Sequence, residues 1–493
     1  MNVEHRTSNI ERRIMISLRY LNYFKMENEQ KIPWTTSEVI EATKGDLLCG
    51  DIKHAFEGVS IDSRIISANE LFVAIKGNVH DGHSFVSDVL SGGVRGFIIS
   101  KNQTCNLVST DWQDKGIVCV VVNDTTKALG DLASFNRRRT DVSVVAITGS
   151  NGKTTTKEMT ASVVSMRYKT LSTKGNFNNE IGLPLTLLDL KNSHQWAVLE
   201  LGMNRPGEID RLGEICAPDI GVITNIGFAH LEGLGSIEGV MNAKGELLER
   251  IKPEGTAVLN ADDSRVLYLS TKTSREVFYF GLSEDARIRA LDVNETATGI
   301  SFTLALPEER IPIELRVFGR FMVSNALAAA SVGYIIGLSS EVIKAGLEYF
   351  QPVKGRINIV DVRGVHIIDD TYNANPNSME AAIRTLSSLK GSSRGILVAG
   401  DMLELGEHAE AMHRKIGSLS ARSNIAKLYV TGEFAEAVAD GVGKEDKNSM
   451  NIFIGSREEI LEDLKKSLLP EDWVLVKGSR EMGMEKIVEG LKI

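Results

Sequence analysis

The sequence predicts an α/β protein of three domains: a small α/β domain, a central domain on a mostly parallel sheet, and a C-terminal Rossmann-like, doubly wound domain. The length of 493 residues allows about three domains of roughly 150 residues each. Between residues 125 and 351, short apolar runs alternate with helix-length segments. This pattern is typical of a parallel sheet covered on both faces. It begins again near residue 352 and predicts the doubly wound domain.

The first domain is predicted to span residues 27–124, where short β-like runs alternate with polar turns. Its buried strands are expected at three apolar runs: 71–75, 97–99 and 117–122. Residues 1–26 are expected to be a flexible extension, because charged side chains interrupt their apolar residues and leave no signal-peptide core. A start at Met26 would explain the same stretch, and a short amphipathic helix is the alternative.

The central domain is predicted to span residues 125–351 and to open with a helix at 126–139. Its strands are expected at 142–148, 196–199, 220–224 and 257–259. The C-terminal domain is predicted to span residues 352–493. Its strands are expected at 366–368, 395–399, 427–430 and 473–476.

Composition and charge exclude several classes of protein. Hydrophobic residues make up 42% and charged residues 25%, which excludes a collagen, a coiled coil and a largely disordered chain. The net charge of −9 argues against a nucleic-acid partner and against binding to a membrane surface. No apolar run approaches the roughly 18 residues of a membrane helix, so no integral membrane segment is expected.

The cysteines point to a reducing compartment. Cys49, Cys105, Cys119 and Cys216 form no closely spaced pair of the kind that binds a metal or cycles between thiol and disulfide. Free thiols are typical of proteins that stay in the cytoplasm, so a cytoplasmic location is expected.

The most informative local signal is a phosphate-binding loop at Thr148-Gly149-Ser150-Asn151-Gly152-Lys153-Thr154. It follows the strand at 142–148 and leads into a helix-compatible stretch at 155–166. Glycines in such a loop let backbone N–H groups approach phosphate oxygens, and the following helix adds a favourable dipole. Lys153 is expected on the β- and γ-phosphates, and Thr154 is expected to offer its hydroxyl to Mg²⁺. Ile147 stands where the common form of this loop has its first glycine.

Glu200 and His230 each follow a predicted strand of the central domain. Ligands of an open α/β sheet bind at the carboxyl ends of its strands, which is where the phosphate-binding loop also lies. Carboxylate oxygen suits Mg²⁺, whereas imidazole is a less usual ligand for it.

The short form of the loop resembles the ATP loop of the Mur ligases, the amide-forming enzymes of peptidoglycan precursor synthesis. Two further motifs resemble the D-alanyl-D-alanine-adding branch of that family: Tyr372-Asn373-Ala374-Asn375-Pro376 and Gly400-Asp401-Met402-Leu403-Glu404-Leu405-Gly406. Other matching stretches are 60–64, 71–74, 81–83, 175–184, 200–203, 225–232, 243–246, 369–371 and 476–480. The resemblance therefore extends from about residue 60 to about residue 490.

The resemblance implies an ATP- and Mg²⁺-dependent ligase. ATP would phosphorylate the terminal carboxylate of UDP-MurNAc-tripeptide, and the amine of D-Ala-D-Ala would attack the acyl phosphate. Such a site must bring two anions together, so cations have to neutralise their repulsion. The third residue of the tripeptide, meso-diaminopimelate or L-lysine, stays open, and a monomer is the default expectation.

The resemblance also implies roles for individual residues. Lys153, His230 and Lys244 would be catalytic, and the nucleotide would be held by Gly149, Asn151, Gly152, Lys153, Thr154, Thr155, Asn325 and Asp370. The metal ligands would be Thr154, Glu200, His230 and an N-carbamoylated Lys244. The substrates would contact Ser63, Arg64, Asn176, Asn178, Asn179, Tyr372, Asn373, Asn375, Lys477 and Arg480. Carbamoylation of Lys244 needs a neutral amine and therefore a lowered pKa.

One departure from the family pattern concerns the nucleotide. Phe321-Met322 stands where the family usually has His-Asn, three residues before Asn325. Either apolar packing holds the adenine, or ATP binds with lower affinity.

Two rival functions remain open from the sequence. A folylpolyglutamate synthase would share the central loop, but it would not explain the motifs of residues 60–125. A non-catalytic nucleotide-binding scaffold is favoured only by Phe321-Met322, whereas the intact Lys153, Glu200 and His230 argue against it.

Overall fold

The computed structural model describes residues 31–77, 79–108, 111–296, 298–445 and 450–492. The expectation for residues 1–26 therefore lies outside the described residues. Three larger sheets follow one another along the chain, and the predicted α/β class is confirmed. No helix of the described part combines the length and apolar character needed to cross a bilayer.

The first sheet has the strand order β2-β7-β6-β5-β4. Its strands are β2 (Asp46–Cys49), β4 (Gly58–Ser60), β5 (Glu70–Val73), β6 (Gly96–Ser100) and β7 (Val118–Val122). The last four run parallel, and β2 is antiparallel to β7. The short strands β1 (Trp34–Thr35) and β3 (Ala55–Phe56) pair with each other, and the helices are α2 (Thr36–Thr43), α3 (Val86–Ser91) and α4 (Thr104–Leu107). The predicted strands correspond to β5, β6 and β7, whereas β2 and β4 are short and only partly apolar, which hid them from the sequence pattern.

Helix α5 (Thr125–Arg138) leads from the first sheet to the second. The side chain of Asp124 caps it by accepting hydrogen bonds from the N–H groups of Thr126 and Lys127. Its buried face packs on α2 and on two helices of the central sheet, α7 (Gly182–Leu188) and α8 (Glu208–Cys216). This helix matches the one expected at 126–139 to within a residue at each end.

The central sheet has the order β16-β15-β14-β13-β12-β11-β8-β10-β9. The strands are β8 (Ser143–Thr148), β9 (Thr170–Ser172), β10 (Trp196–Glu200), β11 (Ile220–Ile223), β12 (Thr256–Asn260), β13 (Glu276–Gly281), β14 (Ile288–Thr296), β15 (Gly299–Ala305) and β16 (Arg310–Leu315). From β14 to β9 the pairs are parallel. Strand β8 lies between β10 and β11, so the direction of winding reverses beside it. Ligands of open α/β sheets bind at such a point.

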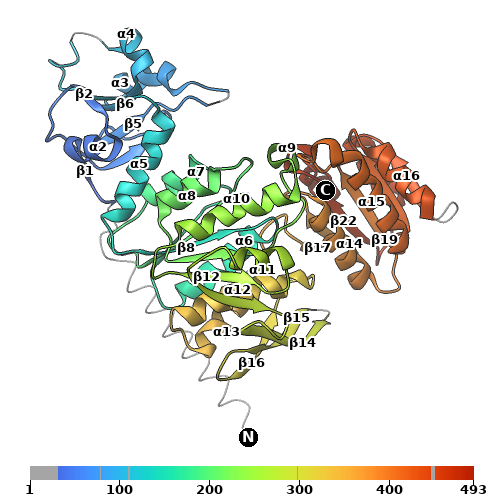
Figure 1. Cartoon of the computed structure of the whole chain (residues 1–493). Helices are drawn as coiled ribbons and strands as arrows, with labels where there is room; N and C mark the ends of the chain where they lie inside the picture. Colours follow the sequence, from blue (N-terminus) through green and yellow to red (C-terminus); the bar gives the residue numbers. More distant parts are fainter. Residues whose placement is uncertain (1–30, 78, 109–110, 297, 446–449, 493) are drawn as a thin grey trace, which may run out of the picture.

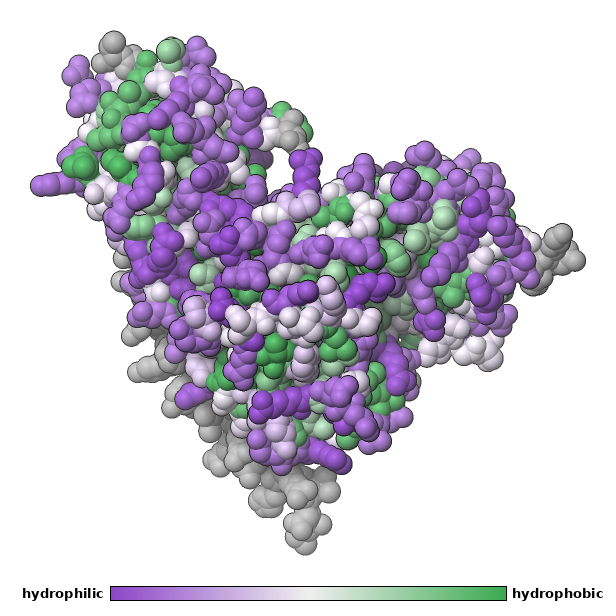
Figure 2. Space-filling view, viewed as in Figure 1, coloured by the Kyte–Doolittle hydropathy of each residue, from purple (hydrophilic) through white to green (hydrophobic). Residues whose placement is uncertain are grey.

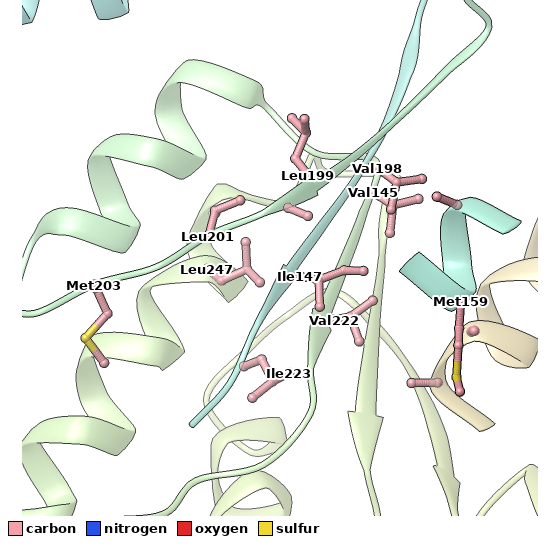
Figure 3. Close-up of a cluster of buried hydrophobic side chains, with 14 of the residues drawn as sticks. Val145, Ile147, Met159, Val198, Leu199, Leu201, Met203, Val222, Ile223 and Leu247 are labelled. Atoms are coloured by element: carbon pink, nitrogen blue, oxygen red, sulfur yellow. The ribbon is translucent and has the colours of Figure 1, made fainter. Parts of the chain in front are cut away.

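Helices cover both faces of the central sheet. The helices α6 (Lys153–Ser165), α12 (Phe321–Ile335) and α13 (Ser340–Tyr349) pack together on one face, and α8 and α10 (Ile237–Arg250) pack together on the other. Figure 3 shows the result: Val145, Ile147 and Val222 point toward Met159 of α6. Leu199, Leu201 and Ile223 point the other way, toward the side that carries Leu247 of α10. Burial on both faces explains why these strands are continuous apolar runs.

The C-terminal sheet has the order β17-β18-β22-β19-β20-β21. Its strands are β17 (Asn358–Val362), β18 (Val365–Asp370), β19 (Gly395–Gly400), β20 (Lys427–Thr431), β21 (Asn451–Ile454) and β22 (Trp473–Lys477). All neighbours are parallel except β17, which is antiparallel to β18. The helices α14 (Pro376–Lys390), α15 (Ala409–Arg422) and α16 (Ala435–Glu445) pack in sequence, and α17 (Arg457–Ser467) packs with α18 (Glu485–Leu491).

In Figure 1 the first sheet lies at the upper left of the central sheet, and the C-terminal sheet lies at its upper right. The space-filling view shows an open notch between them, with a surface rich in polar residues (Figure 2). The C-terminal domain contacts the central domain directly. The segment of the C-terminal domain that begins at Gly406 packs on the short helix α9 (Leu231–Leu234) of the central domain.

Candidate active site

The loop between β8 and α6 has the conformation that its glycines allow. Gly149 has a φ of +151° and Gly152 a φ of +80°, values that favour glycine. A Cβ atom on Gly149 would lie 1.9 Å from Thr224 Oγ1, and one on Gly152 would lie 2.3 Å from Asn325 Oδ1. Both positions therefore exclude any side chain, and the loop backbone stays close to the neighbouring segments.

Residues after β11 hold this loop in place. Ser150 N donates to Asn225 O at 2.9 Å, and Asn151 N donates to Asn225 Oδ1 at 2.9 Å. Thr224 Oγ1 donates to Asn151 O at 2.6 Å. The hydroxyl of Ser150 donates to Gly227 O and accepts from Gly227 N. The loop is thus fixed before any ligand arrives, which reduces the entropic cost of binding.

Two clefts open beside the loop. The first, of about 410 Å³, lies between the loop and the C-terminal sheet, and the second, of about 450 Å³, lies on the β10 side. Predicted site residues in the first wall are Asn151, Gly152, Lys153, Thr154, His230, Asn373, Asn375 and Arg480. Those in the second are Lys153, Asn178, Asn179, Glu200, His230, Tyr372, Asn373 and Arg480. Lys153 and His230 face both clefts, so groups bound in the two would meet beside them.

Two predicted site lysines have lowered pKa values: Lys153, which lines both clefts, and Lys244, which lies outside both walls. Burial lowers the pKa of Lys153 and Arg356 adds to the effect, whereas the carboxylates of Glu200 and Glu404 partly offset it. Its Nζ donates to Gly149 O at 2.7 Å. Lys244 on α10 is 1% exposed, and burial together with the charge of Lys153 holds its pKa well below the usual range. A neutral amine at Lys244 is the form that reacts with carbon dioxide.

Glu200 at the end of β10 is poised to bind a cation. Its side chain is buried, and its Oε1 accepts a hydrogen bond from Asn178 Nδ2 at 2.8 Å. Its Oε2 is buried and has no hydrogen-bond partner in the described part of the chain. An unpartnered buried carboxylate oxygen is costly unless a ligand satisfies it. Among the described residues no three His, Cys, Asp or Glu side chains cluster as a metal site, so a cation here would share Glu200 with phosphate oxygens and water.

His230 meets the C-terminal domain. Its Nδ1 lies 2.6 Å from Glu404 Oε2, and this contact lowers the pKa of Glu404. Both residues have positive φ, +55° for His230 and +62° for Glu404. His230 therefore stands where the central loop, the second cleft and the C-terminal domain come together.

Several predicted site residues lie behind the clefts rather than in their walls. Asn325 is buried, accepts a hydrogen bond from Thr156 Oγ1 at 3.2 Å and contacts Met322 Sδ at 3.8 Å. It supports the loop from below, next to Gly152. Phe321 is partly exposed near Gly319 and Thr385, where the central domain meets α14. A direct contact of Asn325 with the nucleotide stays a prediction.

Asp370 and Lys477 pair with each other. They are opposite one another in the register of β18 and β22, and Lys477 Nζ donates to Asp370 Oδ2 at 2.6 Å. Lys477 also donates to Asn373 O at 2.8 Å. The pair is buried and positions the loop of Asn373 at the cleft. Contacts of the two charges with ribose or substrate stay predictions.

The remaining predicted residues are scattered. Arg64 is exposed and forms a bidentate pair with Asp62, whose pKa falls to about 2, mainly because of these hydrogen bonds. Ser63 and Arg64 lie outside the walls of both clefts. Asn176 is exposed on the loop before α7. Gly149 and Thr155 lie within the phosphate-binding segment but outside both cleft walls.

Arg356 is the main residue missed from the sequence. It faces both clefts, its Nη2 lies 3.4 Å from Thr154 Oγ1, and its Cζ lies 4.1 Å from the ring centroid of Tyr372. No described residue offers a hydrogen-bond partner to its buried Nε. An arginine at this place supplies positive charge between the two clefts, where a phosphate and a carboxylate would approach each other. The sequence around it contains no motif that predicts this role.

The C-terminal domain also touches the phosphate-binding loop through the start of α14. Asn375 Nδ2 donates to Asn151 Oδ1 at 2.8 Å, and Asn377 Oδ1 accepts from Phe228 N at 2.9 Å. Asn375 Oδ1 accepts from Ser378 N at 2.9 Å and so caps α14. One side chain thus serves both the helix and the contact between domains.

These two roles of Asn375 can be separated by substitution. Asn375→Asp keeps the capping oxygen and removes the donor to Asn151, so we expect unchanged thermal stability and a KM for ATP raised about tenfold. Asn375→Ala removes the cap as well and should cost about 1 kcal/mol of unfolding free energy. Thermal unfolding and steady-state kinetics measure the two effects. A wild-type KM for Asn375→Asp would contradict a role of this contact in nucleotide binding.

The fold and site define a three-domain, phosphate-loop enzyme with two adjoining clefts. Three family models match this chain, and all three describe domains of Mur ligases. The Mur ligase middle domain matches residues 147–333, the Mur ligase glutamate ligase domain matches 355–480, and the Mur ligase catalytic domain matches 55–137. The chain belongs to the Mur ligase family, whose members are ATP-dependent ligases.

The chain is also similar to individual members of this family over nearly its whole length. The UDP-N-acetylmuramoyl-tripeptide–D-alanyl-D-alanine ligase of Escherichia coli is 35% identical over 469 residues, which cover 93% of this chain and 98% of that protein. A crystal structure of MurF from Acinetobacter baumannii has a TM-score of 0.86 at 33% identity and covers 94% of this chain and 99% of that one. MurF from Thermotoga maritima in complex with ADP has a TM-score of 0.78 at 28% identity, covering 88% and 97%.

Proposed function

We propose that this protein joins D-Ala-D-Ala to UDP-MurNAc-tripeptide with hydrolysis of ATP, giving UDP-MurNAc-pentapeptide, ADP and phosphate for peptidoglycan synthesis. The observation that carries the proposal is the pair of clefts sharing Lys153 and His230. A nucleotide bound to the phosphate-binding loop and a peptide carboxylate bound in the second cleft would meet beside the positive charge of Lys153. The identity of 35% with a ligase of this specificity over nearly the whole chain supports the choice of substrates.

The reaction proceeds in two displacements. A carboxylate oxygen of the tripeptide attacks the γ-phosphorus of ATP and ADP leaves. The amine of D-Ala-D-Ala then attacks the acyl carbon, phosphate leaves, and the nitrogen loses a proton. Catalysis rests on position and charge, because the protein forms no covalent bond with the substrates.

The residues of the clefts divide this work. Lys153 and Arg356 neutralise the repulsion between phosphate and carboxylate. The loop amides and the N-terminus of α6 bind phosphate oxygens. Asn373 and Arg480 line both clefts from the C-terminal side, and Tyr372 lines the second. We assign UDP-substrate binding, with Ser63 and Arg64, to residues 27–124, ATP binding to 125–351, and closure over the nucleotide to 352–493.

Magnesium fits the donors beside the loop. The free Oε2 of Glu200, the hydroxyl of Thr154 and the imidazole of His230 offer few protein ligands and leave places for phosphate oxygens and water, as Mg²⁺ usually requires. The ion, when bound, neutralises charge on the transferring phosphoryl group. Glu200 holds its orientation through Asn178, which contacts its other oxygen.

We also propose that Lys244 is N-carbamoylated. Its burial and the nearby charge of Lys153 favour the neutral amine that reacts with carbon dioxide. Carbamoylation would replace the buried amine by a carbamate, whose oxygens suit a magnesium ion. Labelling with ¹³C-bicarbonate should give a carbamate NMR signal that is absent from Lys244→Met. Free amine alone at high bicarbonate, with activity insensitive to bicarbonate, would contradict the modification.

We infer a cytoplasmic location, because the reaction consumes ATP and the cysteines are free thiols. We infer that the protein acts as a monomer, since one chain supplies the walls of both clefts.

The test of the proposed function is phosphate release from ATP with UDP-MurNAc-tripeptide, with and without D-Ala-D-Ala. Release that needs both substrates supports the ligase, and no release under any pairing supports a nucleotide-binding scaffold.

A further inference from the structure

One contact joins the catalytic loops of the central domain to the C-terminal domain through a carboxylate. Glu404 lies in the segment after β19, and its Oε2 is 2.6 Å from His230 Nδ1. His230 lies in the segment after β11, 174 residues away in the chain. The contact therefore exists only while the C-terminal domain is docked in this position.

The backbone is shaped to make this contact. His230 and Glu404 both adopt the left-handed conformation, which costs a residue other than glycine about 1 kcal/mol. Glu232 N donates to Glu404 O at 3.1 Å, so the two segments are also joined through the main chain. Gly406 follows closely, and a Cβ atom there would lie 3.6 Å from Glu232 Cα. Strained residues on both sides of one contact indicate that the surrounding structure requires it.

The contact fixes the state of the imidazole. A carboxylate accepts hydrogen bonds, so His230 Nδ1 carries the hydrogen, and in the neutral ring Nε2 is left as the acceptor. A histidine that binds a metal usually donates its other N–H to such a carboxylate. His230 lines both clefts. Because Glu404 holds Nδ1, Nε2 is the ring nitrogen left for a ligand.

We propose that Glu404 is a positioning residue that prepares His230 Nε2 as a cation ligand, so that docking of the C-terminal domain completes the metal site. This inference rests on the proposed function for the identity of the cation. It assigns to the C-terminal domain a part in metal binding, in addition to covering the nucleotide. Glu404 is assigned no contact with the reacting atoms: it positions His230, while its charge also acts on Lys153.

The first test measures metal binding rather than turnover. Mn²⁺ is titrated into the full chain with a non-hydrolysable ATP analogue and followed by electron paramagnetic resonance, and binding to nucleotide alone is subtracted. Glu404→Ala should raise the Kd for Mn²⁺ about tenfold or more. Glu404→Gln, whose amide oxygen still accepts from Nδ1–H, should lie between Glu404→Ala and the wild type. Glu407→Gln is the matched control, because Glu407 is exposed in the same segment and lies outside both cleft walls.

The second test reads the ring directly. In ¹⁵N-histidine spectra of the metal-free chain, the His230 signals, assigned with His230→Gln, should show the Nδ1–H tautomer in the wild type. They should shift toward the Nε2–H tautomer in Glu404→Ala. A wild-type Mn²⁺ affinity for Glu404→Ala, equal losses for Gln and Ala, or an unchanged tautomer would each overturn the proposal. The spectra do not depend on catalysis, so a failed ligase assay would leave their result standing.

Discussion

Lys153→Ala is expected to lower kcat about a thousandfold while leaving the fold intact. Lys153 lines both clefts and lies in the phosphate-binding loop, and the phosphate and carboxylate proposed to meet there repel each other. Loss of its charge leaves Arg356 and Arg480 as the described arginines that line both clefts. Steady-state phosphate release measures the effect, and circular dichroism checks the fold.

A matched control for this variant is Lys174→Ala, which removes an exposed lysine outside both cleft walls. It should keep wild-type kinetics. Retention of more than about a tenth of the rate by Lys153→Ala would contradict its charge-neutralising role.

Glu200→Gln is expected to lower kcat about a hundredfold or more and to leave thermal stability unchanged or slightly raised. The activity falls because a neutral amide is a poor ligand for Mg²⁺. Stability does not fall, because a neutral amide costs less to bury than a charged carboxylate whose Oε2 finds no hydrogen-bond partner among the described residues. A loss of activity without a loss of stability distinguishes a metal-binding carboxylate from a structural one.

The control for Glu200→Gln is Glu249→Gln, which alters an exposed carboxylate on α10. It should change neither quantity. A marked drop in the melting temperature of Glu200→Gln, with the KM for magnesium unaltered, would show that Glu200 supports the fold instead.

The phosphate-binding loop could be predicted from sequence because its signal is local. Gly149, Gly152 and Lys153 lie within five positions, directly after an apolar strand. The positive φ values of both glycines confirm the need for residues without side chains. Glu200 could be placed for a similar reason, since it ends a strand whose apolar run is unmistakable. Strands buried on both faces have the clearest pattern in the chain.

Antiparallel strands β14 to β16 escaped prediction. Their buried and partly exposed residues alternate, as in β15, and polar residues interrupt each run. The positions of Arg356 and Glu404 escaped it for a different reason. Both lie in loops of the C-terminal part and reach the central site only through docking of two sheets. The residue spacing within either loop does not predict this contact between domains.

The pairing of Asp370 with Lys477 shows the same limit of local patterns. The two side chains are 107 residues apart and meet because β18 and β22 are neighbours in register. Each residue was predicted at the site by resemblance, but strand order decides that they face each other. Long-range register is a property of the assembled sheet, whereas the loop at 148–154 is specified by consecutive residues.

In the proposed reaction ATP activates the carboxylate of the peptide by direct phosphorylation, and transfer of a carboxylate oxygen to phosphate tests this step most directly. UDP-MurNAc-tripeptide labelled with ¹⁸O in its terminal carboxylate is incubated with ATP, magnesium, D-Ala-D-Ala and the full chain. We expect one ¹⁸O atom in each phosphate released, because the carboxylate oxygen that attacks phosphorus leaves with it. Unlabelled phosphate, or label in AMP, would contradict the claim.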